Sequence, residues 1–242
     1  MSGLVCNSQT IINAERLNHE DSLVVALSFL YNGNYGNTTT NQFGITPIIA
    51  KIGINNDYKL FGGYNILRSG TETLLNSGFV HARHNYKLTD KLKTFEFYQL
   101  QFNELILLNK REVFGVGLQY SIIPDTTLTF SLGSGIIQEN EFLNPRSIPI
   151  GEKLNTFYIR VTFVGNFEWN INDKLRLNNV VYYQPYVNNI KDYRLLNDFN
   201  LSISIIKNIS FILSSTLRYD NESPSTLKPI DLVNSIELNF SF

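Results

Sequence analysis

Residues 231–242 have the sequence Asp-Leu-Val-Asn-Ser-Ile-Glu-Leu-Asn-Phe-Ser-Phe, and this stretch decides the fold class of the chain. One face of it carries apolar side chains: Leu232, Ile236, Leu238, Phe240 and Phe242. The other face carries polar ones: Asp231, Ser235, Glu237, Asn239 and Ser241. A repeat of two residues is the period of a β-strand and not of a helix. We expect the strand that closes an outer-membrane barrel to end in this way, on an aromatic side chain.

The same alternation recurs along the chain and divides it into about twelve strand-like runs. These runs cover residues 22–32, 42–53, 57–67, 74–88, 92–106, 111–123, 127–138, 156–170, 174–186, 194–206, 209–219 and 231–242. Every second connection is tight, as at Asn55-Asn56, and the others are longer and polar: 33–41, 68–73, 139–155, 187–193 and 220–230, with 107–110 brief. Long loops that alternate with tight turns predict a meander across a bilayer, with the turns on the periplasmic side.

The length of the strands indicates which of their two faces points out of the barrel. They run to about 11–15 residues, whereas strands of about 5–6 residues are commonest in soluble proteins. No helix is predicted that would cover a large apolar face, and twelve strands enclose a lumen too wide for a purely apolar core. We therefore predict an all-β fold: a closed up-and-down antiparallel transmembrane β-barrel of about twelve strands, apolar outside and polar inside. A soluble β-sandwich or a large soluble barrel would show the same alternation and is the alternative.

Aromatic residues near the strand ends fit the two girdles that such barrels place at the membrane interfaces. The candidates are Tyr31, Tyr58, Tyr64, Tyr86, Trp169, Tyr183, Tyr219 and Phe242. Three features interrupt the pattern. In 92–106 the apolar face changes after Phe97, which predicts a β-bulge near Tyr98. Pro47 and Pro185 each remove a ladder donor, which predicts a bulge or a rim position at both.

Composition narrows the function. A chain of 242 residues suits one all-β domain, and a net charge of -1 offers no basic surface for nucleic acid. No apolar run of about 18 residues predicts a transmembrane helix. We expect residues 1–20 to form a leader or periplasmic segment and 21–242 the barrel. Cys6 is the one cysteine of the sequence, so an internal disulfide is excluded. It would be a lipid anchor or part of a trimmed signal. A barrel implies a precursor with a signal peptide.

Several stretches, taken in order, resemble the domain-of-unknown-function 481 family, also called salt-induced outer-membrane proteins. They are Gly33-Asn34, Gly36-Asn37-Thr38, the run from His81 to Leu88, Phe95 to Asn103, Arg111, Gly115-Val116-Gly117-Leu118, Leu195 to Asp198, Leu217 to Asp220, Pro224 and 231–242. The likeness extends from about residue 22 to 242. It implies a Gram-negative outer-membrane barrel with a cleaved signal peptide. It implies no established activity, so no catalytic residue is carried over.

The histidines do not predict a metal or hydrolase site. His81 and His84 are three apart in a strand, so they point to opposite faces and cannot share a metal. An outer-membrane phospholipase would pair His84 with a serine on the lipid face. The neighbouring predicted strands 57–67 and 92–106 contain no serine. We therefore predict no enzyme and no cofactor, with a lipid-modifying enzyme as the most distant alternative.

The polar faces instead predict a charged lumen. The expected lumen residues are His81, Arg83, Glu96, Arg160, Glu168, Arg176, Arg194, Asp198, Arg218 and Glu237. They would form a structural ion-pair network that plugs the barrel, or a ring that selects polar or anionic solutes. The leading prediction is a monomeric barrel of the bacterial outer membrane, structural or related to envelope stress, with outer-membrane lipids as partners. The alternative is a narrow, porin-like channel for small polar solutes.

Overall fold

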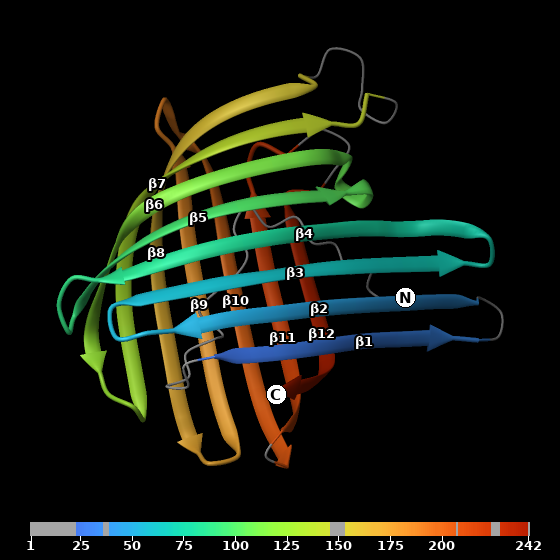
Figure 1. Ribbon diagram of the computed structural model, residues 1–242. Coiled ribbons are helices and arrows are strands. Elements are labelled where there is room, and N and C mark those ends of the chain that lie inside the picture. Colours follow the sequence, from blue (N-terminus) through green and yellow to red (C-terminus); the bar gives the residue numbers. More distant parts are fainter. Residues whose placement is uncertain (1–22, 36–38, 146–152, 207, 224–227, 242) are drawn as a thin grey trace.

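The computed structural model describes residues 23–35, 39–145, 153–206, 208–223 and 228–241. Twelve strands form a closed barrel in which each strand pairs with its sequence neighbours and β1 pairs with β12 (Figure 1). All pairings are antiparallel. The predicted all-β, closed, up-and-down barrel of about twelve strands is thus confirmed. The expected leader, Cys6 and Phe242 lie outside the described residues.

The strands are long, and one short 3-10 helix, η2 (Glu104–Ile106), lies between two of them. Their bounds are β1 (Val24–Asn34), β2 (Thr40–Ile52), β3 (Asn56–Ser69), β4 (Glu72–Lys87), β5 (Leu92–Asn103), β6 (Leu108–Pro124), β7 (Leu128–Leu143), β8 (Asn155–Asn172), β9 (Leu175–Tyr186), β10 (Asn189–Ile206), β11 (Ile209–Asp220) and β12 (Ile230–Ser241). We call the end with the connections β2–β3, β4–β5, β6–β7, β8–β9 and β10–β11 the turn side. The other end is the loop side. No helix in the described part of the chain has the length and apolar character needed to cross a membrane.

Several strands extend further toward the loop side than the sequence pattern indicated. The predicted loop 68–73 is a tight connection at Gly70 and Thr71, where Gly70 adopts a φ of +59°. The predicted loop 187–193 is reduced to Val187 and Asn188. β7 likewise continues to Leu143. These segments were predicted wrongly because polar residues occupy many outward as well as inward positions there, which hides the period of two.

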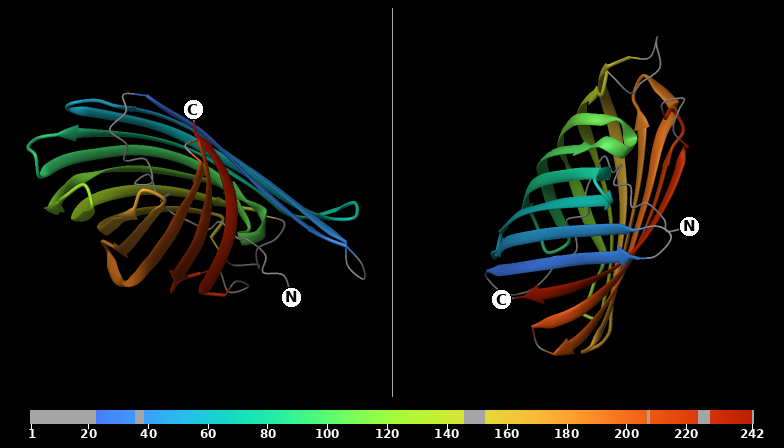
Figure 2. Two further views of the ribbon diagram at one scale, coloured as in Figure 1. Left: turned by 90° about the horizontal axis from the view of Figure 1, so that it is seen from below. Right: turned by 90° about the vertical axis from the view of Figure 1, so that its right-hand side faces the viewer.

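The burial of side chains fixes the orientation of the two faces. Phe163 in β8 is 47 % exposed on the outer face, whereas Arg160 in the same strand is 1 % exposed inside the barrel. The outer face of the barrel carries large apolar side chains, and the inner face carries most of the buried polar ones. This is the arrangement that a hydrocarbon solvent requires, because unpaired polar groups are costly in it. Figure 2 shows the wall formed by β1–β5 facing the wall formed by β9–β12.

Outward aromatics lie near both ends of the strands. On the loop side Tyr183, Tyr193 and Tyr219 line up across β9, β10 and β11, with ring centres 5.6 Å and 5.7 Å apart. Tyr58, Tyr86 and Trp169 lie near the turn side and are also exposed. Exposed aromatic residues at two levels are typical of interface girdles. Tyr193 was missed by the sequence analysis, which had placed it in a loop.

The predicted bulge near Tyr98 is wrong. The β4–β5 register runs without a break from Ser77 opposite Asn103 to Lys87 opposite Lys93. Phe95 and Phe97 keep the inward parity of the strand, and Tyr98 and Leu100 point outward. The sequence analysis assumed that apolar residues must face lipid. Of the two prolines, Pro185 lies beside a register shift in the β9–β10 pairing, as predicted. The prediction is wrong for Pro47, which lies in the middle of β2 in an unbroken register with β1.

Candidate functional site

The lumen is the candidate functional site, because many charged and polar side chains are buried there. It divides into two parts. A filled side, along β6–β10 toward the loop side, is packed with side chains. A hollow side, along β1–β4 and β10–β12 and widening toward the turn side, contains cavities. We describe the filled side first.

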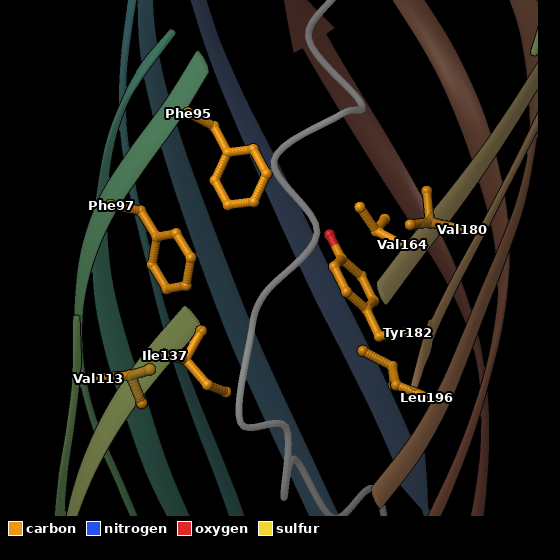
Figure 3. Packing of buried hydrophobic residues seen from close by; sticks show 8 residues of the cluster. All are labelled: Phe95, Phe97, Val113, Ile137, Val164, Val180, Tyr182 and Leu196. Carbon is orange, nitrogen blue, oxygen red and sulfur yellow. The ribbon is translucent and has the colours of Figure 1, made fainter. Parts of the chain in front are cut away.

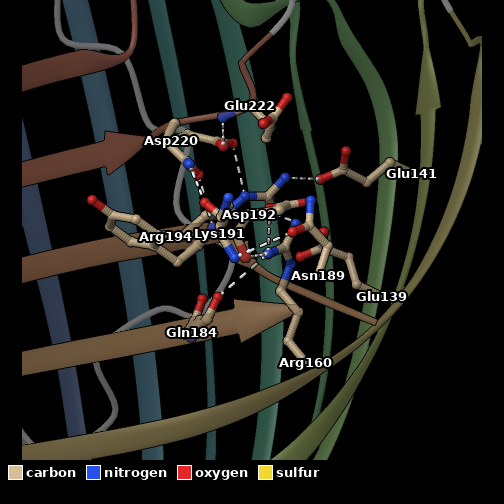
Figure 4. Close-up of polar contacts among 12 residues, drawn as sticks. Glu139, Glu141, Arg160, Gln184, Asn189, Lys191, Asp192, Arg194, Asp220 and Glu222 are labelled. Atoms are coloured by element: carbon tan, nitrogen blue, oxygen red, sulfur yellow. Dashed lines mark hydrogen bonds and ion pairs between the residues drawn. The ribbon is translucent and has the colours of Figure 1, made fainter. Parts of the chain in front are cut away.

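Charged residues cross the lumen near the loop side and form what we call the ionic cluster (Figure 4). Its members come from five strands and are Arg111, Glu139, Glu141, Arg160, Asp192, Arg194 and Asp220. Arg194 on β10 is the hub. Its guanidinium donates to Glu139 at 2.6 Å, to Glu141 at 3.2 Å and to Asp220 at 2.7 Å. The cluster therefore ties β6 and β7 to β10 and β11.

Two further arginines complete the cluster. Arg111 forms an ion pair with Glu141. Arg160 donates from Nη1 to Asp192 Oδ1 at 2.8 Å and to the Gln184 carbonyl at 3.3 Å. The ring of Tyr158 lies 4.8 Å from the Arg160 guanidinium carbon, a cation–π distance. Removing one partner of such a buried network typically costs about 3–5 kcal/mol, because the other charge stays buried and unpaired.

An apolar layer (Figure 3) lies next to the ionic cluster, on its turn side. Its buried members are Phe95, Phe97, Val113, Ile137, Val164, Val180, Tyr182 and Leu196. The strand parity explains the layering. Val113, Ile137 and Leu196 each follow or precede a member of the ionic cluster by two residues, so they face the same lumen one step further in. The filled side therefore contains two layers of side chains, a charged layer near the loop side and an apolar layer next to it.

Glycines make room for the largest side chains of this layer. Gly115 and Gly117 on β6 face inward beside Phe97 and Phe95 of β5. A Cβ atom at Gly115 would overlap the Phe97 ring, and one at Gly117 would overlap the Phe95 ring. The two rings therefore lean over the glycine backbone, which a strand with larger inward side chains would not allow.

An aromatic wall continues from this layer toward the hollow side. The ring of His81 lies between Phe61 and Phe97, with centres 4.7 Å and 5.2 Å away. Its Nδ1 contacts Gln99 Oε1 at 3.0 Å. Phe61 also meets Phe79 edge to face at 6.0 Å. His81 is fully buried in this wall, so it lines the lumen as part of a packed surface and not as a solvated base.

Two adjoining cavities occupy the hollow side. The central cavity has a volume of about 160 Å³ and lies between the β1–β4 wall and the β10–β12 wall. The turn-side cavity has a volume of about 800 Å³ and widens toward the β8–β9 and β10–β11 turns. Both are lined by Ser28, Thr46, Ile48 and Glu237, so the two cavities adjoin. Hydroxyl and amide side chains such as Asn200 and Ser214 supply much of the remaining lining.

The predicted lumen residues are distributed over both sides. His81, Arg83, Arg160, Glu168, Asp198 and Arg218 are buried on the inner face. Arg160 and Arg194 belong to the ionic cluster. Asp198 and Arg218 line the central cavity, and Arg176 lines the turn-side cavity. Glu237 lines both. The predicted set therefore does not form a single circle of charges around the lumen. The guanidinium carbon of Arg83, for example, lies 4.9 Å from the centre of the aromatic ring of Phe95.

Glu96 was placed wrongly by the sequence analysis. Its side chain is 56 % exposed on the outer face and contacts His84 Nδ1 at 2.6 Å. The cause is the expectation that Phe95 and Phe97 face lipid: both point inward, so Glu96 between them points outward. His84 also contacts Asn56 Oδ1 at 2.9 Å and stacks on Tyr58. Both of its ring nitrogens thus contact side-chain oxygens other than a serine hydroxyl.

The sequence analysis missed most of the ionic cluster. Glu139 and Glu141 were assigned to a loop, as were Asp192 and Asp220. Their inward parity continues that of Ile137, Arg194 and Arg218 in the same strands, which is the one signal that could have identified them. The outward neighbours of Glu139 are Gln138 and Asn140, so nothing marks the two faces at that point. Among the residues that the structure describes, no group of three or more metal-ligating side chains is found.

Comparisons with known proteins agree with this architecture. The NanC porin aligns with 91 % of this chain and 98 % of its own, at 13 % identity and a TM-score of 0.55. The KdgM porin in complex with disordered oligogalacturonate aligns with 90 % of this chain and 99 % of its own, at 11 % identity and a TM-score of 0.50. At such identities the likeness concerns the fold alone. No curated relative was found by sequence. A family model does match residues 27–242, and the chain belongs to that family, described as "Protein of unknown function, DUF481".

Proposed function

We propose that this barrel lies in the bacterial outer membrane and provides a narrow path for small polar solutes along its hollow side. The observation that carries the proposal is that the central and turn-side cavities adjoin, with four lining residues in common. Its polar lining suits solutes that exchange water for hydroxyl and amide contacts. Outer-membrane lipids are the partners of the apolar outer face.

The proposal includes a monomer. The pairing of β1 with β12 closes the sheet, so the backbone hydrogen bonds of both terminal strands can be satisfied without a second chain. The two similar structures are porins, which supports a channel by analogy, since a fold alone does not determine a function. We propose no catalytic activity, since the contacts of His84 offer no nucleophile.

A second candidate is a structural or envelope-stress barrel that conducts nothing. The ionic cluster favours it, because an interior held by buried ion pairs resembles a plug more than a pore. In this case the filled side would set the permeability of the whole molecule. In the channel proposal the same cluster only supports one wall of the path.

Conductance of the purified protein in planar bilayers separates the two candidates. The channel proposal predicts stepwise conductance for the wild type and a lower conductance for Ser214→Trp, because Ser214 lines the central cavity. Ser215→Trp is the matched control: it changes the neighbouring serine of β11, which has the opposite parity and faces outward. Its conductance should equal that of the wild type.

Folded protein is verified by heat-modifiable migration in detergent gels before each recording. A folded wild type that inserts but shows no conductance would contradict the channel and support the structural barrel. An unchanged conductance in Ser214→Trp would show that the path does not run past Ser214.

A further inference from the structure

The central cavity is small and has a defined shape. Its volume of about 160 Å³ is close to that of an engineered cavity of about 150 Å³ in another protein, which accepts one benzene molecule. The central cavity therefore has room for one six-membered ring but not for an extended chain. The substituents of such a ring, or further units, would occupy the adjoining turn-side cavity.

One part of its wall is apolar and rigid. Phe61 and Phe79 line it and meet edge to face, with ring planes at 76°. The Phe79 ring lies over Gly63, where a Cβ atom would overlap it. His81 stacks against Phe61 at 4.7 Å and limits its movement. This surface favours the flat, hydrogen-bearing face of a ring over a fully hydrated group.

The same wall presents buried polar atoms that need a partner. Ser77 and Gln101 line the cavity and are 2 % and 5 % exposed. Within the described part of the chain, Ser77 Oγ and Gln101 Nε2 make no hydrogen bond. Gln101 Oε1 accepts from Gln99 Nε2 at 2.8 Å, which fixes the amide with its donor group free. A native structure rarely leaves such atoms unpaired, so a ligand oxygen is the expected partner.

The opposite wall carries mixed polar groups. Asp198, Arg218 and Glu237 provide two carboxylates and one guanidinium, and Ser214, Thr216 and Ser235 add hydroxyls. Ions of a single sign find no favourable ring of charges there. A neutral solute with several hydroxyl groups can donate to the carboxylates and accept from the guanidinium and from Gln101.

We infer that the central cavity binds one neutral ring-shaped polyol, of the size and chemistry of a hexose. An apolar ring face would contact Phe61 and Phe79, while hydroxyls would meet Ser77, Gln101 and the opposite wall. This inference rests on the proposed function for the route by which the solute arrives. It deepens that function by naming the solute class, and binding can be measured without transport.

The test is isothermal titration of the folded barrel in detergent with D-glucose, D-galactose and D-mannose, each in turn. We expect at least one of them to bind. D-sorbitol, which has no ring, and D-glucuronate, which is anionic, should bind more weakly. For the hexose that binds, Gln101→Leu and Phe61→Leu should each lower the affinity about tenfold, the effect of losing one hydrogen bond or one stacked ring. The matched controls Gln138→Leu and Phe114→Leu change outward-facing residues of the same types and should leave it unchanged.

Absence of binding by all three hexoses in folded protein would overturn the inference and indicate a cavity that holds water only. Unchanged affinity in both lumen variants would also overturn it. The two hypotheses fail separately. Conductance without hexose binding leaves the channel standing and removes the hexose site. Hexose binding without conductance keeps the site and contradicts the channel.

Discussion

The filled side and the hollow side of this lumen are built from the same strand period but from different side chains. On the filled side the inward positions carry arginine, glutamate and aromatic residues, which meet across the barrel in the ionic cluster and the apolar layer. On the hollow side serine and threonine, as at Ser28, Thr46 and Ser214, alternate with larger residues and leave space between the walls. The lesson is that alternation alone sets which face is inside. The size and charge of the inward residues decide whether the inside is occupied.

The largest effect is expected from Arg194→Met. The change leaves Glu139 and Glu141 without their shared cation in a buried site, so the free energy of unfolding should fall by about 3–5 kcal/mol. Urea unfolding in lipid or detergent measures it. Arg68→Met, at an exposed position near the end of β3, is the control and should lie within about 0.5 kcal/mol of wild type. Equal stabilities of the two variants would mean that the cluster does not hold the filled side together.

Gly115→Val should have the next largest effect, because its side chain would occupy the space of the Phe97 ring. Overpacking of this kind costs about 1–3 kcal/mol in the free energy of unfolding. Gly165→Val is the matched change on β8, where a Cβ atom would meet only Leu132 at 3.7 Å. A loss of stability at Gly165 as large as that at Gly115 would show that the glycine itself matters, and not the packing over it.

Glu237→Gln sharpens the comparison from the hollow side. It removes a carboxylate that lines both cavities, so the preference for cations over anions should fall by up to about fivefold, which corresponds to about 1 kcal/mol for one charge at close range in water. Reversal potentials in a salt gradient report the change. The outward Glu96→Gln should leave the reversal potential as it is. A shifted reversal potential with Glu96→Gln and none with Glu237→Gln would mean that Glu96 faces the lumen and Glu237 does not.

The smallest effect is expected for His84→Ala. His84 and Glu96 form a partly exposed pair on the outer face, and such pairs contribute about 0–1 kcal/mol. The stability measured in urea should therefore change little. His81→Ala in the same strand removes a buried ring between Phe61 and Phe97 and should destabilise clearly more. The reverse order would be inconsistent with the inward position of His81.

Much of this architecture could be predicted from the sequence. The strand order, the outward face of residues such as Phe163 and the inward face of Arg160 follow from the period of two and from strand length. The parity of 92–106 could not be predicted, because Phe95 and Phe97 are apolar residues that face inward over glycines of β6. The partners of Arg194 were beyond prediction for another reason. Contacts across a lumen join strands that are not neighbours, and their meeting depends on the tilt and register of the whole barrel.

The most direct test of the account places single cysteines on the two sides of the lumen, in a Cys6→Ser background. Ser214→Cys lies on the hollow side and Val164→Cys in the apolar layer of the filled side. A negatively charged methanethiosulfonate reagent is added during bilayer recording, and the current and the extent of labelling are followed. We expect Ser214→Cys to be labelled with a fall in current, and Val164→Cys to stay unlabelled with its current unchanged. Faster labelling at Val164→Cys than at Ser214→Cys would contradict the division into a filled and a hollow side.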